Sequence, residues 1–107
     1  MGINESDVVL YCRHTLNIKK VVDIHITECC LKHDNAWGWT YDEVEGEIDI
    51  ELDINLSGES KLLTLCHEMG HAWQFSEGRE SDEAEALKME GVLRDGYKRH
   101  AGINKIS

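Results

Sequence analysis

A strict alternation of apolar and polar residues over Ile48–Leu56 constrains the fold of this chain more than any other feature. The segment is Ile-Asp-Ile-Glu-Leu-Asp-Ile-Asn-Leu, so one face is apolar and the other is acidic or polar. Because successive side chains of a strand point to opposite faces of a sheet, this pattern predicts a strand with one buried face. A chain of 107 residues has room for about one core, and that core has to cover this face.

The period becomes helical after Ser57-Gly58. Apolar residues at three- and four-residue spacing predict a helix from about Glu59 to Ser76; they are Leu62, Leu65, Cys66, Met69, Ala72 and Trp73. Gly78 is suited to end that helix. Ser81 is a suitable N-cap for a last helix, which begins at Asp82 and ends before Gly102.

Three further elements are predicted upstream. Apolar residues from about Ser6 to Lys19 indicate a first amphipathic helix, and the β-branched segment Val21–Thr27 indicates a strand. Ala36–Tyr41 indicates a second short strand, and Gly46 marks a turn before the third. We therefore predict one α+β domain over residues 1–107, with an N-terminal helix, a three-stranded mainly antiparallel sheet and two C-terminal helices.

The charge disfavours two classes of partner. Acidic residues outnumber basic ones 21 to 11, for a formal charge of −10. Such a surface repels phosphate backbones and anionic lipid headgroups, so direct nucleic-acid binding and membrane binding are not expected. The N-terminus lacks a basic segment followed by an apolar run, and the apolar stretches are too short to cross a bilayer, which predicts a cytoplasmic location.

The cysteines are expected to be reduced. Two of the four, Cys29 and Cys30, are adjacent, and Cys66 falls inside the predicted helix as a small core residue. Cys29 and Cys30 lie near His33, but adjacent cysteines rarely serve one zinc ion together. Buried or half-buried free thiols are therefore the preferred interpretation.

The residues with the clearest chemistry are His67-Glu68-Met69-Gly70-His71, in the middle of the predicted second helix. Positions i and i+4 lie one turn apart on the same helix face, so both imidazoles can reach one metal ion. Zinc suits this arrangement because it accepts neutral imidazole nitrogen and leaves a fourth position open in catalytic sites. We expect one zinc ion per chain.

Glu68 follows the first histidine and is placed beside the metal rather than in its inner sphere. Zinc lowers the pKa of a bound water to about 7, and a neighbouring carboxylate can take the proton of that water. The same carboxylate can deliver the proton to a leaving amine. The pattern therefore predicts zinc-dependent hydrolysis with Glu68 as general base.

Three alternatives remain at this point. The histidines could be surface residues of an ordinary amphipathic helix. The domain could be a binding or regulatory module that keeps the scaffold and cleaves nothing. It could also be a metal-binding protein, which would require more than one zinc per chain.

The segment Thr64-Leu65-Cys66-His67-Glu68-Met69-Gly70-His71-Ala72-Trp73-Gln74 resembles the active-site helix of SprT-like (Spartan-type) metallopeptidases. In layout, Trp37-Gly38-Trp39-Thr40 followed by the alternating segment is similar to the β-hairpin that precedes that helix. The resemblance covers about residues 36–97. It implies a zincin fold, peptide-bond hydrolysis and a third zinc ligand on the following helix.

The third ligand departs from the SprT pattern, which supplies a His followed by Gly. Gluzincins use a glutamate on the next helix, and Glu83-Ala84-Glu85-Ala86 is similar to their setting. Glu83 shares a helix face with Ala86, Leu87 and Glu90, which is expected to pack inward and to bury Leu87 and Leu93. We select Glu83, with Glu90 and Glu85 as alternatives; most of these acids are expected to be solvated.

The substrate is expected to be a peptide or protein. Zincins pair extended peptides with an edge strand, and if Ile48–Leu56 is that edge, its acidic face favours basic segments. Trp37, Trp39 and Trp73 could line a pocket, but large core residues are the simpler interpretation. Tyr41 and Tyr97 have no spacing that ties them to the site.

Overall fold

The computed structural model describes residues 3–31 and 36–102. Its elements follow the predicted order of helix, three strands and two helices. They are α1 (Glu5–Thr15), β1 (Asp23–Cys29), β2 (Gly38–Tyr41), β3 (Glu47–Asp53), α2 (Gly58–Ser76) and α3 (Glu83–Ala101). The domain is therefore α+β, as the periodicity predicts.

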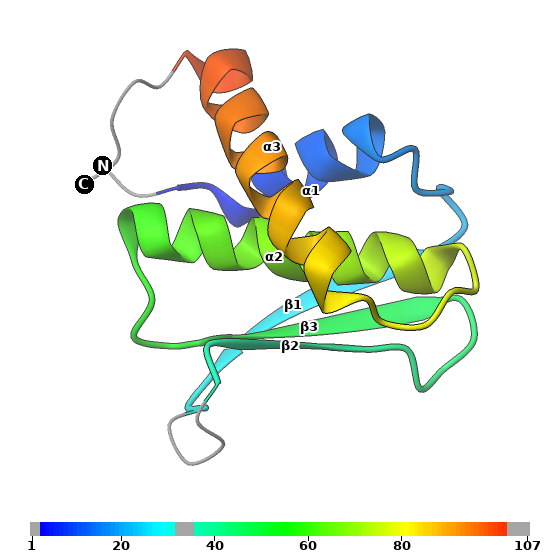
Figure 1. The fold of residues 1–107 in the computed structure, drawn as a ribbon. Helices are drawn as coiled ribbons and strands as arrows, with labels where there is room; N and C mark the ends of the chain where they lie inside the picture. The colour runs from blue at the N-terminus through cyan, green and yellow to red at the C-terminus, as the bar shows by residue number, and fades with distance from the viewer. Residues whose placement is uncertain (1–2, 32–35, 103–107) are drawn as a thin grey trace.

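The core lies between the sheet and α2. Figure 1 shows α2 lying across one face of the sheet, with α1 and α3 packed on the other side of α2. Ile48, Ile50 and Leu52 of β3 are buried, and so are Leu62 and Leu65 of α2. The alternation thus places one face of β3 against the helix, as predicted, and leaves the other face outside.

The sheet is mixed, and the prediction of a mainly antiparallel sheet was wrong. The strand order is β1-β3-β2. β3 pairs with β1 in parallel over seven residues and with β2 antiparallel over four. The strand with the most apolar face lies in the centre, where both neighbours and α2 cover it, and β2 lies at an edge.

β3 ends at Asp53, three residues before the predicted end. The Asp53 carboxylate accepts hydrogen bonds from the Asn55 N–H at 2.8 Å and from the Leu31 N–H at 3.0 Å. These bonds turn the chain and hold the pKa of the buried Asp53 carboxyl below its usual range. Ile54 continues the alternation in sequence but is 60% exposed, because it lies beyond the turn.

α1 is shorter than predicted because Asn17 adopts a positive φ of 55°. Asparagine tolerates this left-handed conformation better than most residues. Leu16 and Ile18 remain buried beyond the helix end. Their burial explains why they match the apolar pattern that extended the predicted helix to Lys19.

The cap of α3 is Asp82, not Ser81 as predicted. The Asp82 side chain accepts from the Glu85 N–H at 3.1 Å, and the helix begins at Glu83. Aspartate and serine are nearly equal as N-caps, so the sequence does not separate them. Ser81 instead places its hydroxyl 3.2 Å from Nδ1 of His71.

Cys12, Cys30 and Cys66 are free thiols, as predicted. Cys12 and Cys66 are buried in the core, whereas Cys30 is exposed, so the prediction of buried or half-buried thiols was wrong for Cys30. His33, considered with Cys29 and Cys30 in the sequence, lies outside the described residues. Over residues 3–31 and 36–102, no helix combines the length and apolar character needed to cross a membrane.

Candidate active site

α2 places His67 and His71 one turn apart on the face that meets the start of α3. The ring centroids lie 4.9 Å apart with an interplanar angle of 79°. Only 13% of the His67 side chain and 8% of the His71 side chain are exposed to solvent. Both rings are therefore held by packing, with their Nε2 atoms available to a group that approaches from α3.

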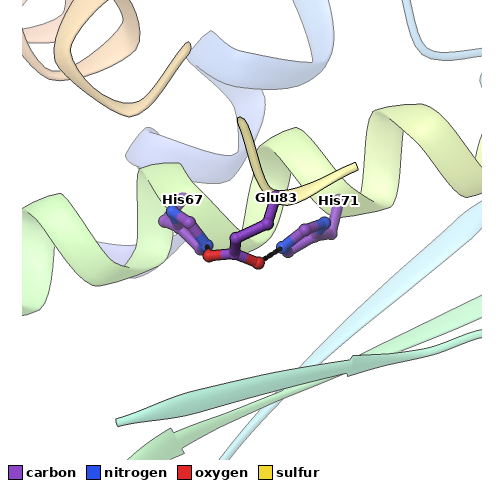
Figure 2. A group of neighbouring side chains, drawn as sticks. All are labelled: His67, His71 and Glu83. Atoms are coloured by element: carbon purple, nitrogen blue, oxygen red, sulfur yellow. Dashed lines mark hydrogen bonds and ion pairs between the residues drawn. The ribbon is translucent and has the colours of Figure 1, made fainter. Parts of the chain in front are cut away.

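Glu83 is that group. Its Oε1 lies 2.7 Å from His67 Nε2 and its Oε2 lies 3.1 Å from His71 Nε2. Figure 2 shows the carboxylate between the two imidazoles, reaching down from the first turn of α3. Of the three glutamates considered from the sequence, Glu83 is the one that the structure brings to both Nε2 atoms.

The three side chains fit a zinc ion. Their ligand atoms all lie within 4.8 Å of one another. A tetrahedral ion with bonds of about 2.0 Å holds its ligands about 3.3 Å apart, so the contacts of 2.7 and 3.1 Å need to lengthen by about 0.6 Å or less. Two imidazoles and one carboxylate are also a donor set that catalytic zinc uses.

Glu90 contacts the other nitrogen of His67. Its Oε2 lies 2.8 Å from Nδ1, whereas Glu83 occupies the Nε2 side. A neutral imidazole has one N–H, so it can donate to only one of these two carboxylates. A cation between Nε2 and Glu83 would bind both of these groups. The Nδ1–H of His67 could then donate to Glu90, which would orient the ring.

Gln74 has the corresponding role at His71. Its Oε1 lies 2.9 Å from Nδ1 of His71 and also accepts from the Asp82 N–H at 2.9 Å. Its Nε2 donates to the Asp82 carbonyl and to Glu85. This fully buried amide therefore fixes the ring and ties the start of α3 to α2. Sequence analysis missed Gln74, although its position three residues after His71 was a usable signal.

Glu85 faces away from the two histidines. Its carboxylate accepts from Gln74 Nε2 at 3.0 Å and from Arg79 at 2.8 Å. These two hydrogen bonds, that from Gln74 first, lower the pKa of Glu85 below its usual range. The helical period predicts this direction, since Glu83 and Glu85 lie about 200° apart around α3.

Glu68 points toward the sheet and is 6% exposed. Thr40 of β2 donates a hydrogen bond of 2.7 Å to Glu68 Oε1. Burial raises the pKa of the Glu68 carboxyl above its usual range, and the bond from Thr40 opposes that shift. Glu68 is therefore held beside the histidines but on the β2 side, outside the group that Glu83 completes.

Gly38 leaves the space that Glu68 occupies. A Cβ at this position would lie 3.0 Å from Glu68 Cγ and 3.2 Å from Glu68 Oε2. It would also lie 3.2 Å from the Thr64 methyl group. A residue with a Cβ at position 38 would press on the Glu68 and Thr64 side chains, so glycine allows β2 to approach Glu68 this closely.

These residues border an open cavity of about 300 Å³. It is lined by Trp37, Gly38, Leu63, Thr64, His67, Glu68, Glu83, Leu87 and Glu90. Leu87 was predicted to be buried and Trp37 to be a core residue; both predictions were wrong, since the residues are 54% and 63% exposed. Leu87, on the helix face that carries Glu83, borders this cavity and is exposed, whereas Ala86 on that face is buried.

The acidic face of β3 lies elsewhere. Because β3 is the central strand, it is not the edge that the sequence analysis considered. Asp49 and Glu51 alternate with the core residues Ile48, Ile50 and Leu52, so they project from the opposite face of the sheet to the one that α2 covers. Tyr41 also points there and donates to Glu51 at 3.0 Å, which excludes it from the candidate site.

Comparisons of the chain with protein-family models, curated proteins and solved structures found no match. Function is therefore inferred from the residues of the site.

Proposed function

We propose that this chain is a zinc-dependent peptidase of the zincin type, in which His67, His71 and Glu83 bind one zinc ion. The observation that carries the proposal is the approach of Glu83 to the Nε2 atoms of His67 and His71, at 2.7 and 3.1 Å. A further carboxylate lies beside this group and is not one of its three candidate ligands. That carboxylate, Glu68, borders the same cavity. Metal binding alone would not need Glu68, whereas hydrolysis does.

The reaction is the addition of water across a peptide bond. Zinc, when bound, supplies a Lewis acid that polarises the carbonyl oxygen and acidifies a water molecule. Glu68 takes one proton from the attacking water while the oxygen of that water bonds to the carbonyl carbon. When the C–N bond breaks, Glu68 returns that proton to the amine nitrogen, so the carboxylate is regenerated.

The substrate backbone is proposed to lie along β2. Among the described residues, β2 has a strand neighbour only on its β3 side. The outer edge of a sheet can offer N–H and C=O groups to an extended peptide. Since Thr40 of this strand already contacts Glu68, a paired peptide would lie close to the general base.

The first test compares zinc-loaded and chelator-stripped protein. We expect the loaded chain to cleave an unfolded protein such as reduced casein, and the stripped chain to cleave none. Zinc at about 100 times its Kd stabilises the folded state by about 2.7 kcal/mol. For a domain of this size, that raises the melting temperature by about 10 °C or more. Cleavage that survives complete removal of metal, or an unchanged melting curve, would contradict the proposal.

A second test concerns Thr40. Thr40→Val keeps the shape but removes the donor to Glu68, so the pKa of Glu68 rises further and less of the base is ionised at a given pH. We expect kcat/KM near neutral pH to fall by about 10-fold or more, with the acidic limb of the pH profile moved to higher pH. Thr40→Ser keeps the donor and serves as the control. A pH profile of kcat/KM that is the same in the native, Thr40→Val and Thr40→Ser chains would exclude a role for Thr40 in setting the pKa of Glu68.

A further inference from the structure

Two large apolar side chains at the mouth of the candidate site are exposed to solvent. Trp37 is 63% exposed and Leu87 is 54% exposed. Single exposed apolar residues are common on protein surfaces and need no explanation. These two, however, line one cavity together with Leu63, His67 and Glu68.

Both side chains are carried by well-anchored backbone. Trp37 directly precedes β2, and its carbonyl accepts a hydrogen bond of 2.9 Å from the Asp53 N–H. Leu87 lies one helical turn after Glu83, on the same face of α3. The spacing between Leu87 and the site is therefore set by the helix that also supplies Glu83.

From this geometry we propose that the cavity binds one large apolar side chain of an extended peptide, next to the peptide bond at which Glu68 acts as general base. This inference rests on the proposed peptidase function and specifies its substrate class. At about 300 Å³ the cavity is at the small end of ligand pockets, which suits a side chain such as leucine or phenylalanine. A peptide paired with β2 projects alternate side chains toward α2, where the cavity lies.

The carboxylates around the cavity are already engaged by neighbouring side chains. Each of the three carboxylates that line it already has a partner. Glu68 accepts from Thr40, Glu83 contacts both histidines, and Glu90 contacts His67. The expected preference for basic peptides rested on the acidic face of β3 as a sheet edge, and β3 is central with that face away from the cavity. We therefore expect a preference for apolar side chains at this cavity.

The test uses zinc-loaded protein and fluorogenic peptides that differ only in the residues flanking the cleaved bond. We expect leucine or phenylalanine at one flanking position to raise kcat/KM about 10- to 100-fold over alanine, and lysine or glutamate to give no such gain. Trp37→Ala and Leu87→Ala should remove most of this gain, so that the leucine, phenylalanine and alanine peptides are cleaved with similar kcat/KM.

Two exposed residues outside the cavity provide matched controls. Val92 lies on α3 and is 54% exposed, as Leu87 is, and Trp39 lies on β2 and is 40% exposed. Val92→Ala and Trp39→Ala should keep the full preference. Equal kcat/KM for all peptides, or equal losses in the controls, would overturn the inference and leave the peptidase proposal standing.

A binding measurement separates the two proposals if no peptide is cleaved. In a chain with Trp39→Phe and Trp73→Phe, Trp37 is the remaining tryptophan. A blue shift of its fluorescence with the leucine peptide, absent with the alanine and lysine peptides, would support the apolar subsite even without hydrolysis. No shift with any peptide, or a shift that depends on protein concentration alone and so reports self-association, would overturn it.

Discussion

Glu68→Gln is expected to abolish peptide hydrolysis and to leave zinc binding and the fold intact. The amide has nearly the shape of the carboxylate, and its oxygen can still accept the hydrogen bond from Thr40, which is 2.7 Å in the native chain. It cannot take a proton from water, however. General-base catalysis contributes about 10²- to 10⁴-fold, so kcat should fall by at least about that range. Single-turnover cleavage and zinc titration of the same preparation measure both effects.

Asp49→Asn is the matched control for this experiment, since it also replaces a carboxylate by an amide. Asp49 is exposed and lies on the face of the sheet opposite to α2. The Asp49→Asn chain should retain full peptidase activity. Near-normal turnover in Glu68→Gln would remove Glu68 from the mechanism, and loss of zinc from that variant would assign it a binding role instead.

The histidine pair and Glu83 could be predicted from sequence because their arrangement depends mainly on helical period. His67 and His71 are four residues apart, and Glu83 is the first residue of the next helix, where its largely exposed side chain reaches both rings. The partners on Nδ1 could not be assigned in this way. Whether Glu90 reaches Nε2 or Nδ1 of His67 depends on how α3 crosses α2, which is a tertiary property.

The same limit applies to the sheet. Local alternation predicts that β3 is a strand, but its central place depends on which neighbours cover it best. Trp37 and Leu87 show a different limit. A periodic pattern counts every apolar residue as core, and these two lie where a cavity replaces the packing. Such departures from local rules are expected at functional sites.

Glu83→Ala is expected to cost far more zinc affinity than Glu85→Ala or Glu90→Ala. Glu83 is the only one of the three with an oxygen facing Nε2 of His67 and Nε2 of His71. Glu90 acts through Nδ1 of His67, and loss of such an outer partner typically lowers affinity about 10- to 100-fold. Loss of the direct ligand Glu83 should lower zinc affinity by more than this. Glu85→Ala should have the smallest effect of the three. Competition with a chromogenic chelator measures all three affinities on one scale.

A second group of residues has to be separated in that titration. Asp23, His25 and Glu47 also place their ligand atoms within 4.8 Å of one another, on the β1 and β3 strands. All three are accessible to solvent, so any zinc bound there should be weak. The titration is therefore run in a His25→Ala chain, in which one zinc should remain and Glu83→Ala should remove it. If Glu90→Ala loses more affinity than Glu83→Ala in this background, the third ligand is Glu90, and α3 must rotate on metal binding to bring that carboxylate to Nε2.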